Sequence, residues 1–219
     1  MNITAPAPFP QPATGTFKAS SAARMICRIL TWSRVPLALG YVLLHQLWQH
    51  SLQDAGPIAP SLVMQGMLFI ALITDWLDGM LARHWRVQSV EGALTDPLSD
   101  AIMFTLVFGV FYLGEPRHLC PLDAFLIIAV RELLMHTTIR PILMARKLAA
   151  GAKWTGKVKT VVQSIVVFWI SAMPLFVLWL PPLALSTTTS QWLCRFCALL
   201  SVGSLFPYLS AIFKPAPAK

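Results

Sequence analysis

Six long apolar segments set the fold of this chain. They cover residues 35–52, 59–82, 97–114, 121–144, 158–182 and 191–213. A helix needs about 20 apolar residues to cross a bilayer, and the last two segments supply that length with few polar interruptions. We therefore predict an all-α, polytopic membrane protein with six transmembrane helices.

The composition is that of a chain largely in contact with lipid. Hydrophobic residues make up 56% of the sequence and charged residues only 12%, whereas a typical soluble domain has about 25% charged residues. The net charge is +8 at pH 7, but the basic residues lie between the apolar segments and form no polar domain. We expect anionic lipid or an anionic substrate as the partner, and no nucleic acid.

The N-terminal residues differ from the rest of the chain. Residues 1–16 are rich in Pro, Ala and Thr and lack the features of a signal peptide, so we expect a disordered cytosolic tail. Residues 17–30 mix apolar side chains with Lys18, Arg24 and Arg28, which favours a short N-terminal interfacial helix on anionic headgroups. An irregular basic flank explains these residues equally well. The membrane domain would comprise residues 17–219.

The positions of lysine and arginine predict the orientation in the membrane. With six spans, one side receives only Arg117 and Arg195, while Arg131 falls within a span. The other side receives the remaining basic residues: Lys18, Arg24, Arg28, Arg34, Arg83, Arg86, Arg140, Arg146, Lys147, Lys153, Lys157, Lys159, Lys214 and Lys219. Because basic residues collect on the cytosolic side, we expect both termini there. The small chain without extensions favours a bacterial inner membrane.

Polar side chains inside the earlier spans indicate where the functional site lies. Such groups are costly at membrane depth and usually face a protein interior or a watery cavity. At about 100° per residue, one stripe of a helix holds Asp75, Asp78, Gly79 and Ala82, with Arg83 at its border. This part of the second span therefore presents two carboxylates beside small residues.

A second acidic stripe follows after a short loop on the predicted cytosolic side. Gly92, Asp96 and Asp100 are spaced by four residues, so they share one face of a helix. Two antiparallel helices joined by that loop would bring all four aspartates together near the membrane surface.

Four carboxylates at close range need cations, because like charges disfavour one another's ionised form. Mg²⁺ and Mn²⁺ prefer oxygen ligands and commonly share them with substrate phosphates. Two such ions match the charge of four aspartates and can hold a diphosphate. Gly79 and Ala82 would leave room for a ligand, and Arg83 could bind a phosphate.

The whole stretch fits the pattern D-x2-D-G-x2-A-R-x8-G-x3-D-x3-D at every fixed position. In this the chain resembles the CDP-alcohol phosphatidyltransferase family, whose members are six-helix, usually dimeric membrane enzymes with a cytosol-facing site. The resemblance implies transfer of a phosphatidyl group from CDP-diacylglycerol to an alcohol, with release of CMP. It implies that the metal ligands are Asp75, Asp78, Asp96 and Asp100.

The resemblance also implies further roles. Asp100 would be the general base for the acceptor hydroxyl, and Gly79, Ala82 and Arg83 would contact the CDP part. The first span of relatives often begins Asn-x-x-Thr-x-x-Arg. Here Arg28 replaces the Asn, while Thr31 and Arg34 match and are expected on the nucleotide side.

The acceptor alcohol is indicated by a separate group of residues. Gly156-Lys157-Val158-Lys159-Thr160, followed by Gln163, resembles a segment of the family's phosphatidylglycerophosphate synthases, as does the Arg131-Glu132 pair. These enzymes use glycerol 3-phosphate, which predicts an acceptor site made of Arg131, Arg140, Lys157, Lys159 and Thr160. The spacing of Arg140 from Arg131 differs by one residue from that expected. Ala101 stands where those synthases usually carry Lys.

Other interpretations stay open at the level of sequence. The two lysines also suit a simple positive-inside anchor, and Arg131 with Glu132 also suits an ion pair that only packs helices. Serine, inositol phosphate or phosphatidylglycerol could replace glycerol 3-phosphate as the acceptor. Outside the family chemistry, the alternatives are a CDP-lipid hydrolase, a cation transporter and a catalytically silent paralogue.

Overall fold

The computed structural model describes residues 21–50, 56, 58–85, 87, 90–114, 118–146 and 154–213. Within these ranges every regular element is helical, and the predicted all-α class is confirmed. The predicted tail at residues 1–16 lies outside the described residues.

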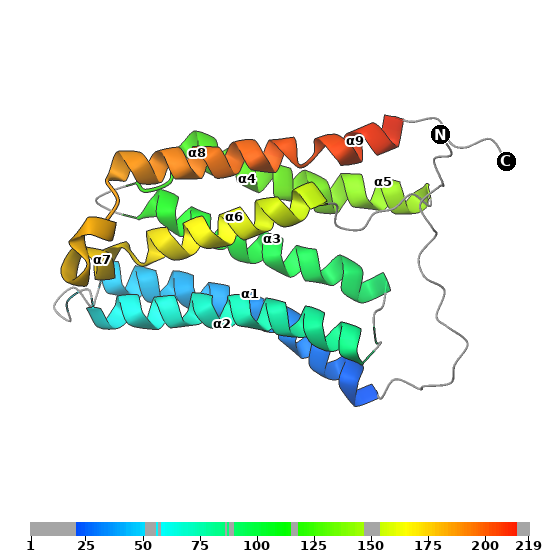
Figure 1. The fold of residues 1–219 in the computed structure, drawn as a ribbon, viewed down its shortest axis with the longest axis horizontal. Coiled ribbons are helices and arrows are strands. Elements are labelled where there is room, and N and C mark those ends of the chain that lie inside the picture. Colours follow the sequence, from blue (N-terminus) through cyan, green and yellow to red (C-terminus); the bar gives the residue numbers. More distant parts are fainter. Residues whose placement is uncertain are drawn as a thin grey trace.

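The helices form an elongated bundle (Figure 1). In chain order they are α1 (Ser21–His50), α2 (Ile58–His84), α3 (Val90–Leu113), α4 (Leu122–Leu134), the π-helical turn η2 (Met135–Ile139), α5 (Arg140–Ala145), α6 (Trp154–Ser171), α7 (Met173–Trp179), the 3-10 turn η3 (Pro181–Leu183), α8 (Thr187–Gly203) and α9 (Phe206–Phe213). The described part of the chain begins at Ser21 and ends at Phe213 on the same end of the bundle (Figure 1).

Four helical stretches in the described residues are long and apolar enough to cross a membrane: Ser21–His50, Ile58–His84, Thr95–Leu113 and Thr187–Phe213. A fifth is added if α6 and α7, which meet at an angle of 52°, count as one span. Pro174 explains the break, because proline cannot donate a helical hydrogen bond and clashes with the preceding turn. Helical residues 122–145 are not among these spans. They carry Asp123, Arg131, Glu132 and Arg140.

The first helix differs from the sequence interpretation. A separate interfacial helix was expected over residues 17–30, but α1 continues without a break from Ser21 to His50. Pro36 lies inside α1 and leaves it helical. The basic residues Arg24 and Arg28 are therefore on the first turns of the same helix that later carries Thr31 and Arg34.

The core lies where α1 packs on α2 and α3, with α6 and α8 closing it from the other side. Tyr41, Phe108 and Ile128 are among its fully buried side chains. Many large apolar side chains point outward instead, including Leu43, Leu126 and Leu199. A surface of this kind is suited to lipid rather than water.

Candidate active site

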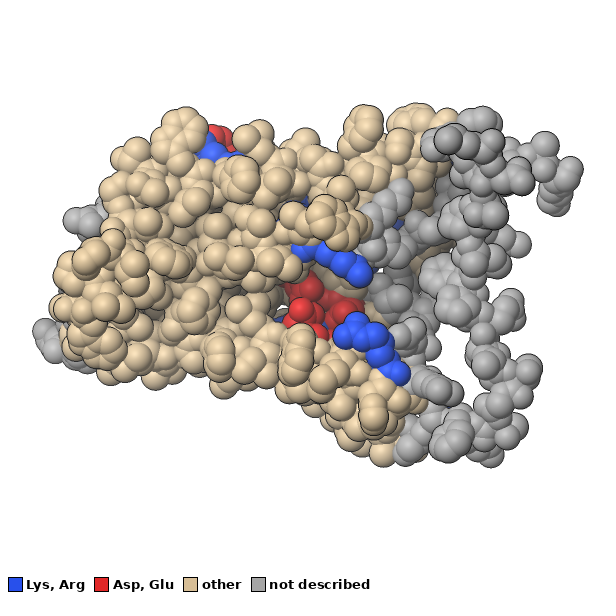
Figure 2. All heavy atoms as spheres, viewed as in Figure 1, with Lys and Arg blue, Asp and Glu red and all other residues tan. Residues whose placement is uncertain are grey.

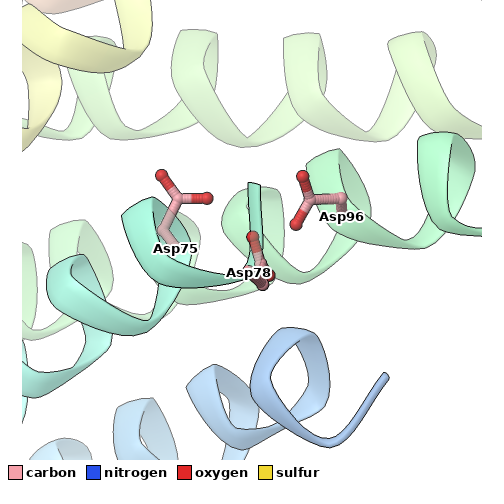
Figure 3. Close-up of side chains that lie close together, drawn as sticks. All are labelled: Asp75, Asp78 and Asp96. Atoms are coloured by element: carbon pink, nitrogen blue, oxygen red, sulfur yellow. The ribbon is translucent and has the colours of Figure 1, made fainter. Parts of the chain in front are cut away.

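The four aspartates come together at the contact between two helices. Asp75 and Asp78 lie on α2, and Asp96 and Asp100 lie on α3. One carboxylate oxygen each from Asp75, Asp78 and Asp96 lies within 4.8 Å of the others. Figure 3 shows these three side chains directed into one space. The predicted meeting of the two acidic stripes is confirmed by this geometry.

Arg34 of α1 reaches into the middle of the aspartates. Its Nη1 donates to Asp100 and lies 3.1 Å from the Oδ1 of Asp75. Its Nη2 donates to Asp78, and to the Oδ1 of Asp96 at 2.6 Å. The Arg34 side chain is 0% exposed. One buried guanidinium therefore contacts all four carboxylates.

Thr31 lies one turn before Arg34 on the same face of α1. Its hydroxyl donates to the Oδ2 of Asp78 over 3.0 Å. The sequence pattern assigned Thr31 and Arg34 to the nucleotide side. In the structure both side chains contact carboxylates, and neither is among the described residues that line the cavity in front of the aspartates.

The aspartates suit a divalent cation. Four carboxylates opposite one guanidinium carry an excess of negative charge, and carboxylate oxygens are the ligands that Mg²⁺ and Mn²⁺ prefer. The side chains of Asp75 and Asp96 are 40% and 39% exposed, so both can be reached from the cavity. Asp78 is buried against Arg34 and Thr31. Asp100 is not in the described group of three oxygens that could share one ion.

A cavity of about 440 Å³ opens in front of the carboxylates. Asp75, Asp96 and Asp100 line one side of it. Basic residues from α4, α5 and α6 line the other side. Figure 2 shows acidic atoms in a recess, with basic atoms on either side of it. Acidic and basic groups thus face each other across one space.

The predicted contacts to a CDP group lie at the acidic side. Gly79 and Arg83 are among the described residues that line the cavity, whereas Ala82 is not. A side chain added at Gly79 would meet only the end of Arg83, 3.8 Å from its Nη1. The lack of a side chain at Gly79 therefore widens the cavity next to Asp75.

Glu132 organises the basic side. Its Oε2 accepts from the Nη1 of Arg131 at 2.8 Å, and its Oε1 accepts from the Nζ of Lys159. Arg131 also donates to the Ser204 hydroxyl at 2.7 Å and to the carbonyl of Ser201 at 3.2 Å. Arg131 and Lys159 are thus held in place, and one of their two charges is neutralised.

Arg140 differs from these paired cations. It is 6% exposed and lines the cavity, and within the described residues its Nε has no hydrogen-bond partner. Lys157 is exposed at the cavity mouth. The Thr160 hydroxyl lines the cavity but donates to its own helix, to the carbonyl of Gly156 at 3.1 Å. Arg140 and Lys157 are therefore the cations best placed to receive an anion.

Two polar residues that line the cavity were not foreseen from the sequence. His136 follows Glu132 by one helical turn, with its Nε2 3.9 Å from the Oε2 of that glutamate. Tyr208 comes from α9 and lies over Gly156, where an added Cβ would be 3.6 Å from the phenol oxygen. The four-residue spacing after Glu132 was a usable signal for His136. Tyr208 had none, because α9 reaches the cavity only through tertiary packing.

Comparison with known proteins gives a consistent result. A family model described as CDP-alcohol phosphatidyltransferase matches residues 24–193. The chain is 29% identical over 163 residues to a CDP-diacylglycerol–glycerol-3-phosphate 3-phosphatidyltransferase of Salmonella choleraesuis, covering 71% of this chain and 81% of that protein. It is 28% identical over 191 residues to the protein of the same name from Escherichia coli K12, covering 84% of this chain and 92% of that protein.

Proposed function

Because the chain belongs to the CDP-alcohol phosphatidyltransferase family, we propose that it transfers the phosphatidyl group of CDP-diacylglycerol to glycerol 3-phosphate and releases CMP. The names of its relatives support this acceptor. The observation that carries the proposal is a cavity with carboxylates on one side and, on the other, buried Arg140, whose Nε has no hydrogen-bond partner among the described residues. An enzyme that joins a diphosphate donor to a phosphate-bearing alcohol needs both.

The acidic side would bind the donor. Asp75, Asp78 and Asp96 would hold a divalent ion, and these residues together with Asp100 would serve two, Mg²⁺ or Mn²⁺. When bound, the ions neutralise the diphosphate and stabilise the charge that develops on CMP. Arg83 would bind a donor phosphate, and Gly79 leaves space for it.

Asp100 would accept the proton of the acceptor hydroxyl. That oxygen forms a bond to the phosphorus of the phosphatidyl group, while the bond from this phosphorus to the CMP oxygen breaks. The proton ends on the Asp100 carboxylate, and the electron pair leaves with CMP. A positioned base of this kind contributes about 10²- to 10⁴-fold to a rate. The position of Asp100 on the cavity wall supports this role.

The basic side would bind the phosphate of the acceptor. Arg140 and Lys157 supply charge that no described carboxylate takes up. Arg131 and Lys159 would add hydrogen bonds from positions fixed by Glu132, and Thr160 would complete the wall. Arginine is suited to this task because its planar group binds phosphate through two nitrogens.

The membrane arrangement follows from the same bundle. Helical residues 122–145 would form the remaining span, since Arg131, Glu132 and Arg140 line the cavity rather than a lipid-facing surface. Both termini and the cavity would face the cytoplasm of a bacterial inner membrane, in line with the distribution of lysine and arginine. The chain would be a homodimer, as the family resemblance implies, surrounded by membrane lipid.

CMP release by the purified full-length protein tests the proposal. The reaction contains CDP-diacylglycerol and Mg²⁺, and glycerol 3-phosphate, serine or inositol phosphate is added separately. We expect release only with glycerol 3-phosphate, and at least a hundredfold loss in Asp100→Asn. Asp123→Asn is the matched control, because Asp123 is a carboxylate on α4 paired with Arg195 rather than in the cavity.

Each other outcome has a definite meaning. Release with a different alcohol would keep the family reaction and reject the acceptor. Release without any acceptor would identify a hydrolase. No release under any condition would favour a silent protein or a transporter.

A further inference from the structure

A π-helical turn interrupts the helix that carries the acceptor side of the cavity. It spans Met135–Ile139, between α4 with Arg131 and α5 with Arg140. The backbone N–H of Arg140 donates to the carbonyl of Met135, five residues earlier, instead of four as in an α-helix. Turns of this kind hold one extra residue and are frequently found at functional sites.

The sequence explains why the wide turn forms here. Pro141 follows Arg140 and has no N–H to donate to the carbonyl of Thr137, and its ring would clash with that carbonyl in a regular helix. The Thr137 hydroxyl donates to the carbonyl of Leu133 at 2.8 Å, and such bonds tend to bend helices. Both features loosen the α-helical pattern within these residues.

The extra residue changes which side of the helix Arg140 faces. Nine residues separate it from Arg131, and in an unbroken α-helix this puts the two side chains about 180° apart. The π-turn takes up one residue, so the angle between the two side chains is that of eight α-helical residues. This angle is about 80° once two full turns are subtracted. Both arginines are 6% exposed and line the same cavity.

We infer that the π-turn Met135–Ile139 is the positioning element that directs Arg140 into the cavity as the receptor for the acceptor's phosphate. This role rests on the proposed function. It explains how a nine-residue spacing gives an arginine pair on one side of the helix. The same register keeps Ile139 and Leu143 packed against Tyr208, so the turn also holds α5 on α9.

Deletions test the register directly. Thr138 is exposed, so its removal costs little packing. Because Pro141 would disrupt the α-helix that the deletion restores, every deletion is made together with Pro141→Ala. Pro141→Ala alone is the reference. Deleting Thr138 alone closes the π-turn into an α-turn and leaves Arg140 in place. Deleting Thr137 and Thr138 rotates α5 by about 100°.

Two readouts are taken on the full-length protein in detergent. The first is KM for glycerol 3-phosphate against KM for CDP-diacylglycerol, and the second is the melting temperature. We expect the single deletion to match Pro141→Ala in both KM values, with a melting temperature within about 4 °C. We expect the double deletion to raise KM for glycerol 3-phosphate about ten- to a hundredfold, as does Arg140→Ala. KM for CDP-diacylglycerol stays unchanged in Arg140→Ala.

The inference is overturned if the single deletion raises KM for glycerol 3-phosphate, or lowers the melting temperature, as much as the double deletion. A double deletion that fails to fold while the single deletion folds supports it, because the core contacts of α5 share the register. If no variant, nor the natural sequence, uses glycerol 3-phosphate, the proposed function fails. The melting temperatures still test the register in that case.

Discussion

Arg34 on α1 forms a buried ion pair with Asp78 on α2, 44 residues later in the chain. The Arg34 side chain is 0% exposed and that of Asp78 is 4% exposed. Asp78 also accepts from the Thr31 hydroxyl. The pair therefore joins the first two helices from inside the bundle, directly behind the carboxylates that face the cavity.

Replacing Arg34 by glutamine should destabilise the metal-free protein strongly. Removing one partner of a buried ion pair typically lowers the free energy of unfolding by about 3–5 kcal/mol, and here four carboxylates lose their shared cation. Added Mn²⁺ should restore more stability to Arg34→Gln than to the natural sequence, since the ion supplies the missing charge. Thermal unfolding in detergent, with chelator and then with Mn²⁺, measures both effects.

Arg195→Gln is the control for that experiment. Arg195 pairs with Asp123 at 2.9 Å, but these side chains are 37% and 55% exposed. An exposed pair contributes about 0–1 kcal/mol, so little change is expected. Equal effects of Arg34→Gln and Arg195→Gln would show that the buried contacts of Arg34 do not hold the aspartates together.

Gly79→Ala should separate stability from donor binding. Alanine is favoured over glycine inside a helix by up to about 1 kcal/mol. The added methyl would meet only the end of Arg83. We therefore expect an unchanged or slightly higher melting temperature but a raised KM for CDP-diacylglycerol, because the methyl projects into the cavity beside Asp75.

Gly66→Ala provides the match on the same helix. Nothing lies within 4 Å of a Cβ added there, and Gly66 is not among the described residues that line the cavity. Gly66→Ala should have the same effect on the melting temperature as Gly79→Ala, without any change in KM for CDP-diacylglycerol. If Gly79→Ala also leaves KM unchanged, the donor does not approach this part of α2.

The meeting of the aspartates could be predicted from sequence, because it depends only on helical period and one short loop. Four-residue spacing puts Asp96 and Asp100 on one face whatever surrounds them. The contact of Arg34 with these carboxylates could not be predicted, since it depends on how α1 packs across α2 and α3. The pattern identified Arg34 as important but assigned it to the nucleotide.

The register of Arg140 shows a second limit of helical period. The spacing of Arg140 from Arg131 differs by one residue from that expected by resemblance to the family, and counting residues at 100° each places Arg140 opposite Arg131. The π-turn is favoured by Pro141 and by the competing Thr137 hydroxyl, which a periodic count does not include. The break between α6 and α7 is similar, because it follows from Pro174 inside an otherwise continuous apolar segment.

The affinity for divalent ions should fall when one of the clustered aspartates is replaced. Asp96→Asn removes one of the three oxygens that lie within 4.8 Å of one another, so we expect weaker Mn²⁺ binding by at least about tenfold. Asp123→Asn should bind Mn²⁺ like the natural sequence. Calorimetry or electron paramagnetic resonance of the purified protein measures this without turnover. Undiminished binding in Asp96→Asn would place the ion elsewhere.

Glu132→Gln should destabilise the bundle through the cations it leaves behind. Arg131 and Lys159 are buried and share Glu132 as their carboxylate, and unpaired buried charges cost about 3–5 kcal/mol in the free energy of unfolding. Lys159→Met removes one surplus charge while keeping a long apolar side chain. The double variant should therefore be more stable than Glu132→Gln alone. If the losses in free energy of unfolding from Glu132→Gln and Lys159→Met simply add in the double variant, Glu132 and Lys159 are not coupled. Glu132 then does not organise the basic side of the cavity.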